Sequence, residues 1–115
     1  MPNKAMIITE FGVDGNRSGP VDERGTYAFQ ADTAAYDLGV FGARPWLSGA
    51  LYFVLQDFVS FPEYSGGNPL PDPPYNRKGL FDLNGNAKPV EGVVSSIYHN
   101  TVQMAPRRAS PQGGT

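Results

Sequence analysis

The chain contains no cysteine and only one histidine among its 115 residues. Without cysteine there is no disulfide and no thiolate metal ligand, and the single His99 cannot form a histidine cluster. The sequence therefore contains no recognisable metal site. We expect neither a metal ion nor another cofactor.

An excess of charge of one sign and long apolar runs are also missing. The formal net charge is -2 at pH 7, and the lysines and arginines are scattered along the chain. Since nucleic-acid-binding proteins carry a basic patch, we expect no nucleic-acid partner. No apolar run approaches the roughly 20 residues that cross a bilayer, and the apolar stretch before Glu10 is too short for a signal peptide, so we expect no membrane partner. The cellular location stays open, with a slight preference for the cytoplasm.

The apolar residues that are present change their period in an orderly way. Residues 5–9 and 49–55 form short continuous apolar runs, which are typical of strands covered on both faces in a parallel sheet. Between them apolar residues recur at spacings of four and three, which predicts an amphipathic helix that stops near Gly39 or Gly42. Pro89 can open a second helix with several apolar residues on one face. The helical stripes are Tyr27, Ala31, Ala34, Leu38 and Phe41, and then Val90, Val93, Val94, Ile97 and Tyr98.

Polar segments rich in glycine and proline follow each predicted strand, over residues 12–25 and 60–75. Asp14 in the first of them is typical of a turn and receives no role. Two parallel strands alone leave both edges of the sheet open. This indicates that the chain is a piece of a larger α/β fold. We expect a partial domain over residues 1–104, built from two strand and helix units, and a disordered tail over residues 105–115.

Glu10 ends the first predicted strand, within the stretch MIITEFG. Burial of a charged side chain without a partner costs several kcal/mol of free energy. A carboxylate at the end of a buried strand therefore normally has a structural or chemical role. One interpretation is an ion pair with a neighbouring strand, which is the more common use of such a position. The other is a catalytic carboxylate, since α/β barrels and doubly wound sheets build their sites at the carboxyl ends of strands.

Three blocks in order, ITEFG, GALYFVLQDF and NRKGLFDLNGNAKP, resemble the C-terminal end of the catalytic barrel in glycoside hydrolase family 2, the group of β-galactosidases and β-glucuronidases. The resemblance runs over residues 4–98. It implies an α/β fold, the C-terminal fragment of a (β/α)8 TIM barrel with strands 7 and 8 and their helices. It also implies that Glu10 is the nucleophile of a retaining β-glycosidase, which hydrolyses O-glycosidic bonds of β-galactosides or β-glucuronides through a covalent glycosyl-enzyme intermediate.

A retaining glycosidase needs a second carboxyl group about 5 Å from the nucleophile to act as general acid and base. In the family this is a Glu that follows an Asn at the end of the fourth strand, and the chain contains no Asn-Glu pair. Glu23 and Glu63 fall in predicted loops, and Glu91 falls in the last predicted helix. We therefore expect the missing acid/base and the remainder of the barrel, its partner, to lie before Met1, and the isolated chain to be inactive.

Other positions match the family residue by residue. Phe53 stands where many members carry a Trp of the sugar platform, although it could equally be a core residue. Asn76 and Lys78 form an Asn-x-Lys similar to the pair with which β-glucuronidases hold the carboxylate of glucuronic acid, and the alternative is a solvated turn. Asp57 matches as well, and we interpret it as an orienting ion pair or loop anchor.

A hypothesis from a different class stays open. The chain could be a non-catalytic carbohydrate-binding or assembly module derived from such a barrel, with its half-open sheet completed by self-association into a homo-oligomer. The strand-end charge and the three preserved blocks favour the glycosidase interpretation, in which the partner is a β-linked glycoside substrate.

Overall fold

A computed structural model describes residues 4–101 of the chain. Its elements, in chain order, are β1 (Met6–Phe11), β2 (Gly15–Arg17), β3 (Gly25–Thr26), α1 (Tyr27–Gly42), β4 (Leu47–Tyr52), β5 (Phe58–Val59), β6 (Tyr75–Asn76) and α2 (Pro89–Asn100). These elements form a small α/β unit. The predicted disordered tail over residues 105–115 lies outside the described residues.

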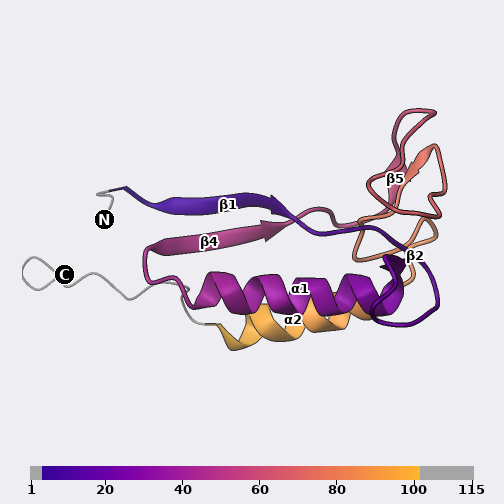
Figure 1. The fold of residues 1–115 in the computed structure, drawn as a ribbon. Coiled ribbons are helices and arrows are strands. Elements are labelled where there is room, and N and C mark those ends of the chain that lie inside the picture. The colour runs from indigo at the N-terminus through magenta and orange to yellow at the C-terminus, as the bar shows by residue number, and fades with distance from the viewer. Residues whose placement is uncertain (1–3, 102–115) are drawn as a thin grey trace, which may run out of the picture.

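The two long strands form one layer and the two helices form another. β1 pairs in parallel with β4, with Met6 opposite Leu47 and Phe11 opposite Tyr52. Figure 1 shows α1 and α2 side by side on the same side of this strand pair. The predicted pair of parallel strands joined by a helical crossover is therefore confirmed.

Within residues 4–101 the long strands are covered on one face only, so the prediction of strands buried on both faces is wrong for this part of the chain. Met6 and Ile7 in β1 are 44% and 53% exposed, and Leu51 in β4 is 59% exposed. The physical reason is that both helices pack against the same face.

No helix in the described residues is long and apolar enough to cross a bilayer.

The core lies between the strand pair and the two helices. Its buried members are Ala34 and Leu38 of α1, Ala50 of β4, and Val90 and Val94 of α2. These are largely the residues that the helical periodicity selects, so the two predicted helices are confirmed. Pro89 begins α2 as expected, because the first helical position needs no backbone N–H donor.

β4 ends at Tyr52, three residues earlier than the apolar run predicts. From Val54 on, the backbone bonds to a different segment. The N–H of Leu80 donates to the carbonyl oxygen of Val54 at 2.9 Å, and the N–H of Phe81 donates to that of Leu55 at 3.0 Å. Hydrogen bonds to residues 80 and 81 thus replace the ladder to β1.

Four short strands lie within or beside the segments predicted as loops, and sequence periodicity did not indicate them. β2 pairs with β3, and β5 pairs with β6. Strands of two or three residues are too short to show an alternating pattern. They gather at the carboxyl ends of β1 and β4 (Figure 1), so the long loops lie where the sequence analysis expects a site.

Leu38→Ala tests the packing of the core. Leu38 is 3% exposed within the core cluster, so we expect truncation to lower the free energy of unfolding by about 2–5 kcal/mol, the range for buried leucines that leave a cavity. Urea denaturation measures the change. Leu70→Ala is the matched control, because Leu70 is 60% exposed and should cost less than about 0.5 kcal/mol. Equal losses in the two variants would contradict the assigned core.

Candidate functional site

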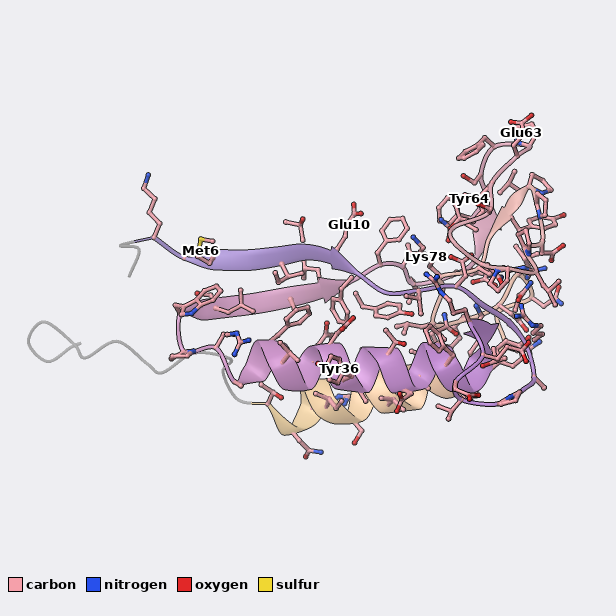
Figure 2. The ribbon with its side chains drawn as sticks, in the orientation of Figure 1. Met6, Glu10, Tyr36, Glu63, Tyr64 and Lys78 are labelled. Atoms are coloured by element: carbon pink, nitrogen blue, oxygen red, sulfur yellow. The ribbon has the colours of Figure 1, made fainter. Side chains whose placement is uncertain are left out.

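Glu10 lies one residue before the end of β1, and its side chain is exposed. Figure 2 shows it pointing away from α1 and α2, over the face of the strand pair that the helices leave free. None of the ion pairs within residues 4–101 involves Glu10. Its carboxylate is therefore open to a ligand or to groups outside the described residues.

Phe53 comes directly after β4 and lies beside the strand that carries Glu10. Its backbone N–H donates to the carbonyl oxygen of Phe11 at 2.9 Å. Its half-buried ring meets the ring of Phe58 edge to face, with centroids 6.0 Å apart. An aromatic surface thus begins next to Glu10.

Asn76 and Lys78 reach the same end of the sheet from the last loop. The backbone N–H of Val54, the residue after Phe53, donates to the carbonyl oxygen of Lys78 at 3.4 Å. Lys78 is half-buried, and Figure 2 shows it between Glu10 and Tyr64. The structure therefore brings three of the predicted site segments together at the carboxyl ends of β1 and β4.

The Asn76 side chain has a defined orientation. Asn76 is buried, and its Oδ1 accepts a hydrogen bond from the backbone N–H of Lys78 at 3.0 Å. Since the acceptor of an N–H must be the amide oxygen, the NH2 group of Asn76 faces elsewhere and is the group left to donate. An amide donor and an ammonium group on alternate residues suit an anionic ligand.

Asp57 acts as a loop anchor, as the sequence analysis interprets it. Its side chain is fully buried and forms ion pairs with Lys88 at 2.7 Å and with Arg77 at 3.3 Å. The backbone N–H of Gly79 donates to Asp57 Oδ1 at 2.8 Å. The carboxylate is thus neutralised and hydrogen-bonded where it is buried, which is the condition for keeping a charge in a protein interior.

Lys88 and Gln30 hold this end of the molecule together, and sequence reasoning missed both. Lys88 is buried, and burial lowers the pKa of its ammonium group. Gln30 lies in α1 and is also buried, with Nε2 donating to the carbonyl oxygens of Val13 at 3.1 Å and Gly79 at 3.3 Å. The partners lie far away in sequence, and a lysine before a helix looks like a surface residue. No local pattern could have identified these contacts.

Asp14, which received no role from the sequence, is buried beneath the loops. Its Oδ1 accepts from the Tyr64 hydroxyl at 3.0 Å, and its Oδ2 accepts from the backbone N–H of Arg77 at 3.1 Å. Burial raises the pKa of Asp14, and the two hydrogen bonds only partly oppose that shift. Burial also raises the pKa of Tyr64 above its ordinary value.

Within residues 4–101 no three His, Asp or Glu side chains come together in the manner of a metal site. The buried carboxylates of Asp14 and Asp57 are occupied by the hydrogen bonds and ion pairs described above. The chemistry available at this end of the sheet is therefore that of an exposed carboxylate, an aromatic surface and a cation with an amide donor.

Comparison with known proteins identifies similar folds among solved structures. No protein-family model and no curated protein sequence matches the chain. A glycoside hydrolase family 2 β-galacturonidase from Eisenbergiella tayi bound to glycerol matches with a TM-score of 0.75 and 20% identity over 89% of this chain and 18% of that chain. The galacturonate-bound structure of a family 2 β-galacturonidase from the same organism matches with a TM-score of 0.71 and 22% identity. The match covers 83% of this chain and 17% of that chain. The β-glucuronidase of Bifidobacterium dentium complexed with coumarin-3-O-glucuronide matches with a TM-score of 0.67 and 23% identity. The match covers 81% of this chain and 14% of that chain.

The resemblance to glycoside hydrolase family 2 is thus confirmed at the level of the fold. The chain has the fold of a small part of these enzymes and spans less than a fifth of the length of the solved chains it matches.

Asp14→Asn tests the burial of the carboxylate under the loops. Because the pKa of Asp14 is raised in the folded state, the folded protein binds the proton more tightly than the unfolded chain. The free energy of unfolding should therefore fall as the pH rises from about 3.9, the unfolded Asp value, through the raised pKa. The Asn variant lacks this contribution, so it should gain stability relative to the wild type over that window. Urea denaturation from acid to neutral pH measures the difference.

Tyr64→Phe provides the companion measurement. The Tyr64 hydroxyl lowers the pKa of Asp14, so its removal should extend the loss of stability to higher pH. A stability difference between wild type and Asp14→Asn that does not change with pH would contradict the assignment.

Proposed function

We propose that this chain is the C-terminal part of a (β/α)8 barrel, with β1 and β4 as the seventh and eighth strands, and that the intact protein is a retaining β-glycosidase acting on β-linked uronides. In such barrels the helices form the outer layer, and active sites lie at the carboxyl ends of the strands. The two helices on one side of a parallel pair, the loops gathered at the carboxyl ends and the match to part of several glycoside hydrolases support this assignment.

The position of Glu10 is the observation that carries the proposal. Its exposed side chain lies at the carboxyl end of β1, on the face that the helices do not cover. That face is the interior side in a barrel, and a substrate would bind where the strands end, at their carboxyl ends. In the proposed reaction an oxygen of the Glu10 carboxylate attacks the anomeric carbon and forms an ester to the sugar, while the aglycone leaves. Water then cleaves the ester and regenerates the carboxylate.

The second carboxyl group would come from a barrel strand outside this chain. It must lie about 5–5.5 Å from Glu10 to protonate the leaving oxygen and later to activate water. Glu23 and Glu63 lie in loop segments, and Glu91 lies in α2 on the far side of the strand pair. None of them ends a long strand beside Glu10.

A carboxylate on the sugar would be the feature that Asn76 and Lys78 recognise. The free NH2 group of Asn76 and the ammonium of Lys78 can each donate a charge-assisted hydrogen bond to it. The solved structures with this fold include β-galacturonidases and a β-glucuronidase, whose names denote uronic acid sugars. Phe53 would supply an aromatic face to the apolar side of the ring. A β-galactoside carries no such anion, so uronides are favoured.

Glu10→Gln tests the nucleophile. A 2-deoxy-2-fluoro uronosyl fluoride should label the intact protein, and peptide mass spectrometry should place the added mass on Glu10. The variant should take up no label, and kcat/KM should fall by at least about 10⁴-fold, because an amide cannot form the ester intermediate.

Glu63→Gln is the matched control for that experiment. Glu63 is exposed on the loop far from the end of β1 (Figure 2), so this variant should be labelled like the wild type. Labelling of another residue would contradict the proposed nucleophile. Sugar binding without any label would favour the non-catalytic module instead.

Lys78→Met tests the recognition of the uronate. Because a neutral sugar lacks the carboxylate, the loss of the ammonium should raise KM for a p-nitrophenyl β-uronide by about 10-fold or more and change KM for the neutral β-glycoside by less than about threefold. Steady-state kinetics on both substrates measures the change. Lys4→Met, at the opposite end of β1, should alter neither constant. Equal effects of Lys78→Met on both substrates would exclude a role in carboxylate recognition.

A further inference from the structure

The backbone of Arg77 lies between Asn76 and Lys78, the two residues proposed to hold the sugar carboxylate, and hydrogen bonds hold both its N–H and its carbonyl group. Its N–H donates to Asp14 Oδ2 at 3.1 Å. Its carbonyl oxygen accepts from the backbone N–H of Gly15 at 2.9 Å and from Lys88 Nζ at 2.9 Å. The direction of the two neighbouring side chains therefore depends on groups that belong to other segments.

Lys88 Nζ joins three of those segments. It donates to the carbonyl oxygen of Gly15 at 2.9 Å, to Asp57 Oδ1 at 2.7 Å and to the carbonyl oxygen of Arg77 at 2.9 Å. The first acceptor follows β1, the second follows β4, and the third precedes Lys78. An ammonium group has three hydrogens, and all three are used. Lys88 has no donor left for a ligand, so any effect on substrate passes through the residues that it holds.

Gln30 reinforces the same junction from α1. Its Nε2 lies 3.4 Å from the Arg77 carbonyl oxygen, in addition to its contacts with Val13 and Gly79. A Cβ atom on Gly15 would lie 2.3 Å from Gln30 Oε1, so the loop after β1 packs directly on this amide. Gln30 therefore contacts the same carbonyl oxygen as Lys88, at a longer distance.

We propose that Lys88 is a positioning residue for substrate specificity: its ammonium group fixes the Arg77 peptide so that the Asn76 amide and the Lys78 ammonium point at the carboxylate of a uronide. This inference rests on the proposed function. Loss of Lys88 would leave the Arg77 carbonyl and Asp57 with fewer donors and would allow residues 76–78 to shift. A neutral glycoside does not use that pair, so its binding would change much less.

Lys88→Met in the intact protein tests the inference, because methionine is of similar length and cannot donate. We expect KM for a p-nitrophenyl β-uronide to rise by about 10-fold, with KM for the neutral β-glycoside changed by less than about threefold. A merely structural role would reduce the amount of active enzyme, which lowers kcat for both substrates by the same factor and leaves each KM unchanged. That second pattern would overturn the proposal.

A second variant covers the case in which Lys88→Met does not fold. Asp57→Asn combined with Lys88→Met removes the buried carboxylate together with its buried partner, Arg77 keeps its ion pair with Asp72, and the Asn oxygen can still accept from the N–H of Gly79. Breaking only one side of a buried pair is the more damaging change. The same selective rise in KM for the uronide is expected, and unchanged KM values in this folded variant would overturn the proposal.

Lys78→Met separates failure of this inference from failure of the proposed function. If Lys78→Met raises KM for the uronide and Lys88→Met does not, Lys88 has no positioning role and the proposed function stands. If Lys78→Met has no selective effect, the recognition of a uronate by this chain is itself wrong, and the inference falls with it. The third case is that both single variants raise KM for the uronide selectively. If the Lys78→Met/Lys88→Met double variant then has the same KM for the uronide as Lys78→Met alone, Lys88 acts through Lys78.

Discussion

The buried ion pair between Asp57 and Lys88 is the interaction on which the loop end of this molecule depends. The loops after β1 and β4 are rich in glycine and proline and contribute few residues to the apolar core. They are held instead by one carboxylate with two cationic partners, at 2.7 and 3.3 Å. Removal of the Asp57 carboxylate would leave the buried Lys88 ammonium without a counter-ion, at a cost of about 3–5 kcal/mol. The loops therefore keep a defined shape without a core of their own.

Two separate sources of stability then serve two parts of the fold. Apolar packing between the strand pair and the helices supports the platform, and the polar network fixes the segments at the carboxyl ends of the strands. Both helices cover the same face of the strand pair, and Glu10 projects over the opposite face. The proposed nucleophile lies on the rigid platform, and the proposed recognition residues lie on the network.

The sequence predicts the parts of this arrangement that depend on local patterns. Apolar periodicity locates both helices and both long strands, and the resemblance between three blocks and a known family assigns roles to Glu10 and to the Asn-x-Lys segment. Asp57 was correctly interpreted as an anchor. The partners of Lys88 could not be predicted, because they lie 11, 31 and 73 residues away along the chain. The end of β4 was also missed, since hydrogen bonds to a distant segment, not hydrophobicity, decide it.

A crystal structure of the intact protein trapped with a 2-fluoro uronide would show directly whether Glu10 is the nucleophile and whether Asn76 and Lys78 hold the sugar carboxylate. We expect a covalent bond between the anomeric carbon and a carboxylate oxygen of Glu10. We also expect the sugar carboxylate within hydrogen-bond distance of Asn76 Nδ2 and Lys78 Nζ. A sugar bonded to a different residue, or one whose carboxylate points away from this pair, would contradict the proposed function.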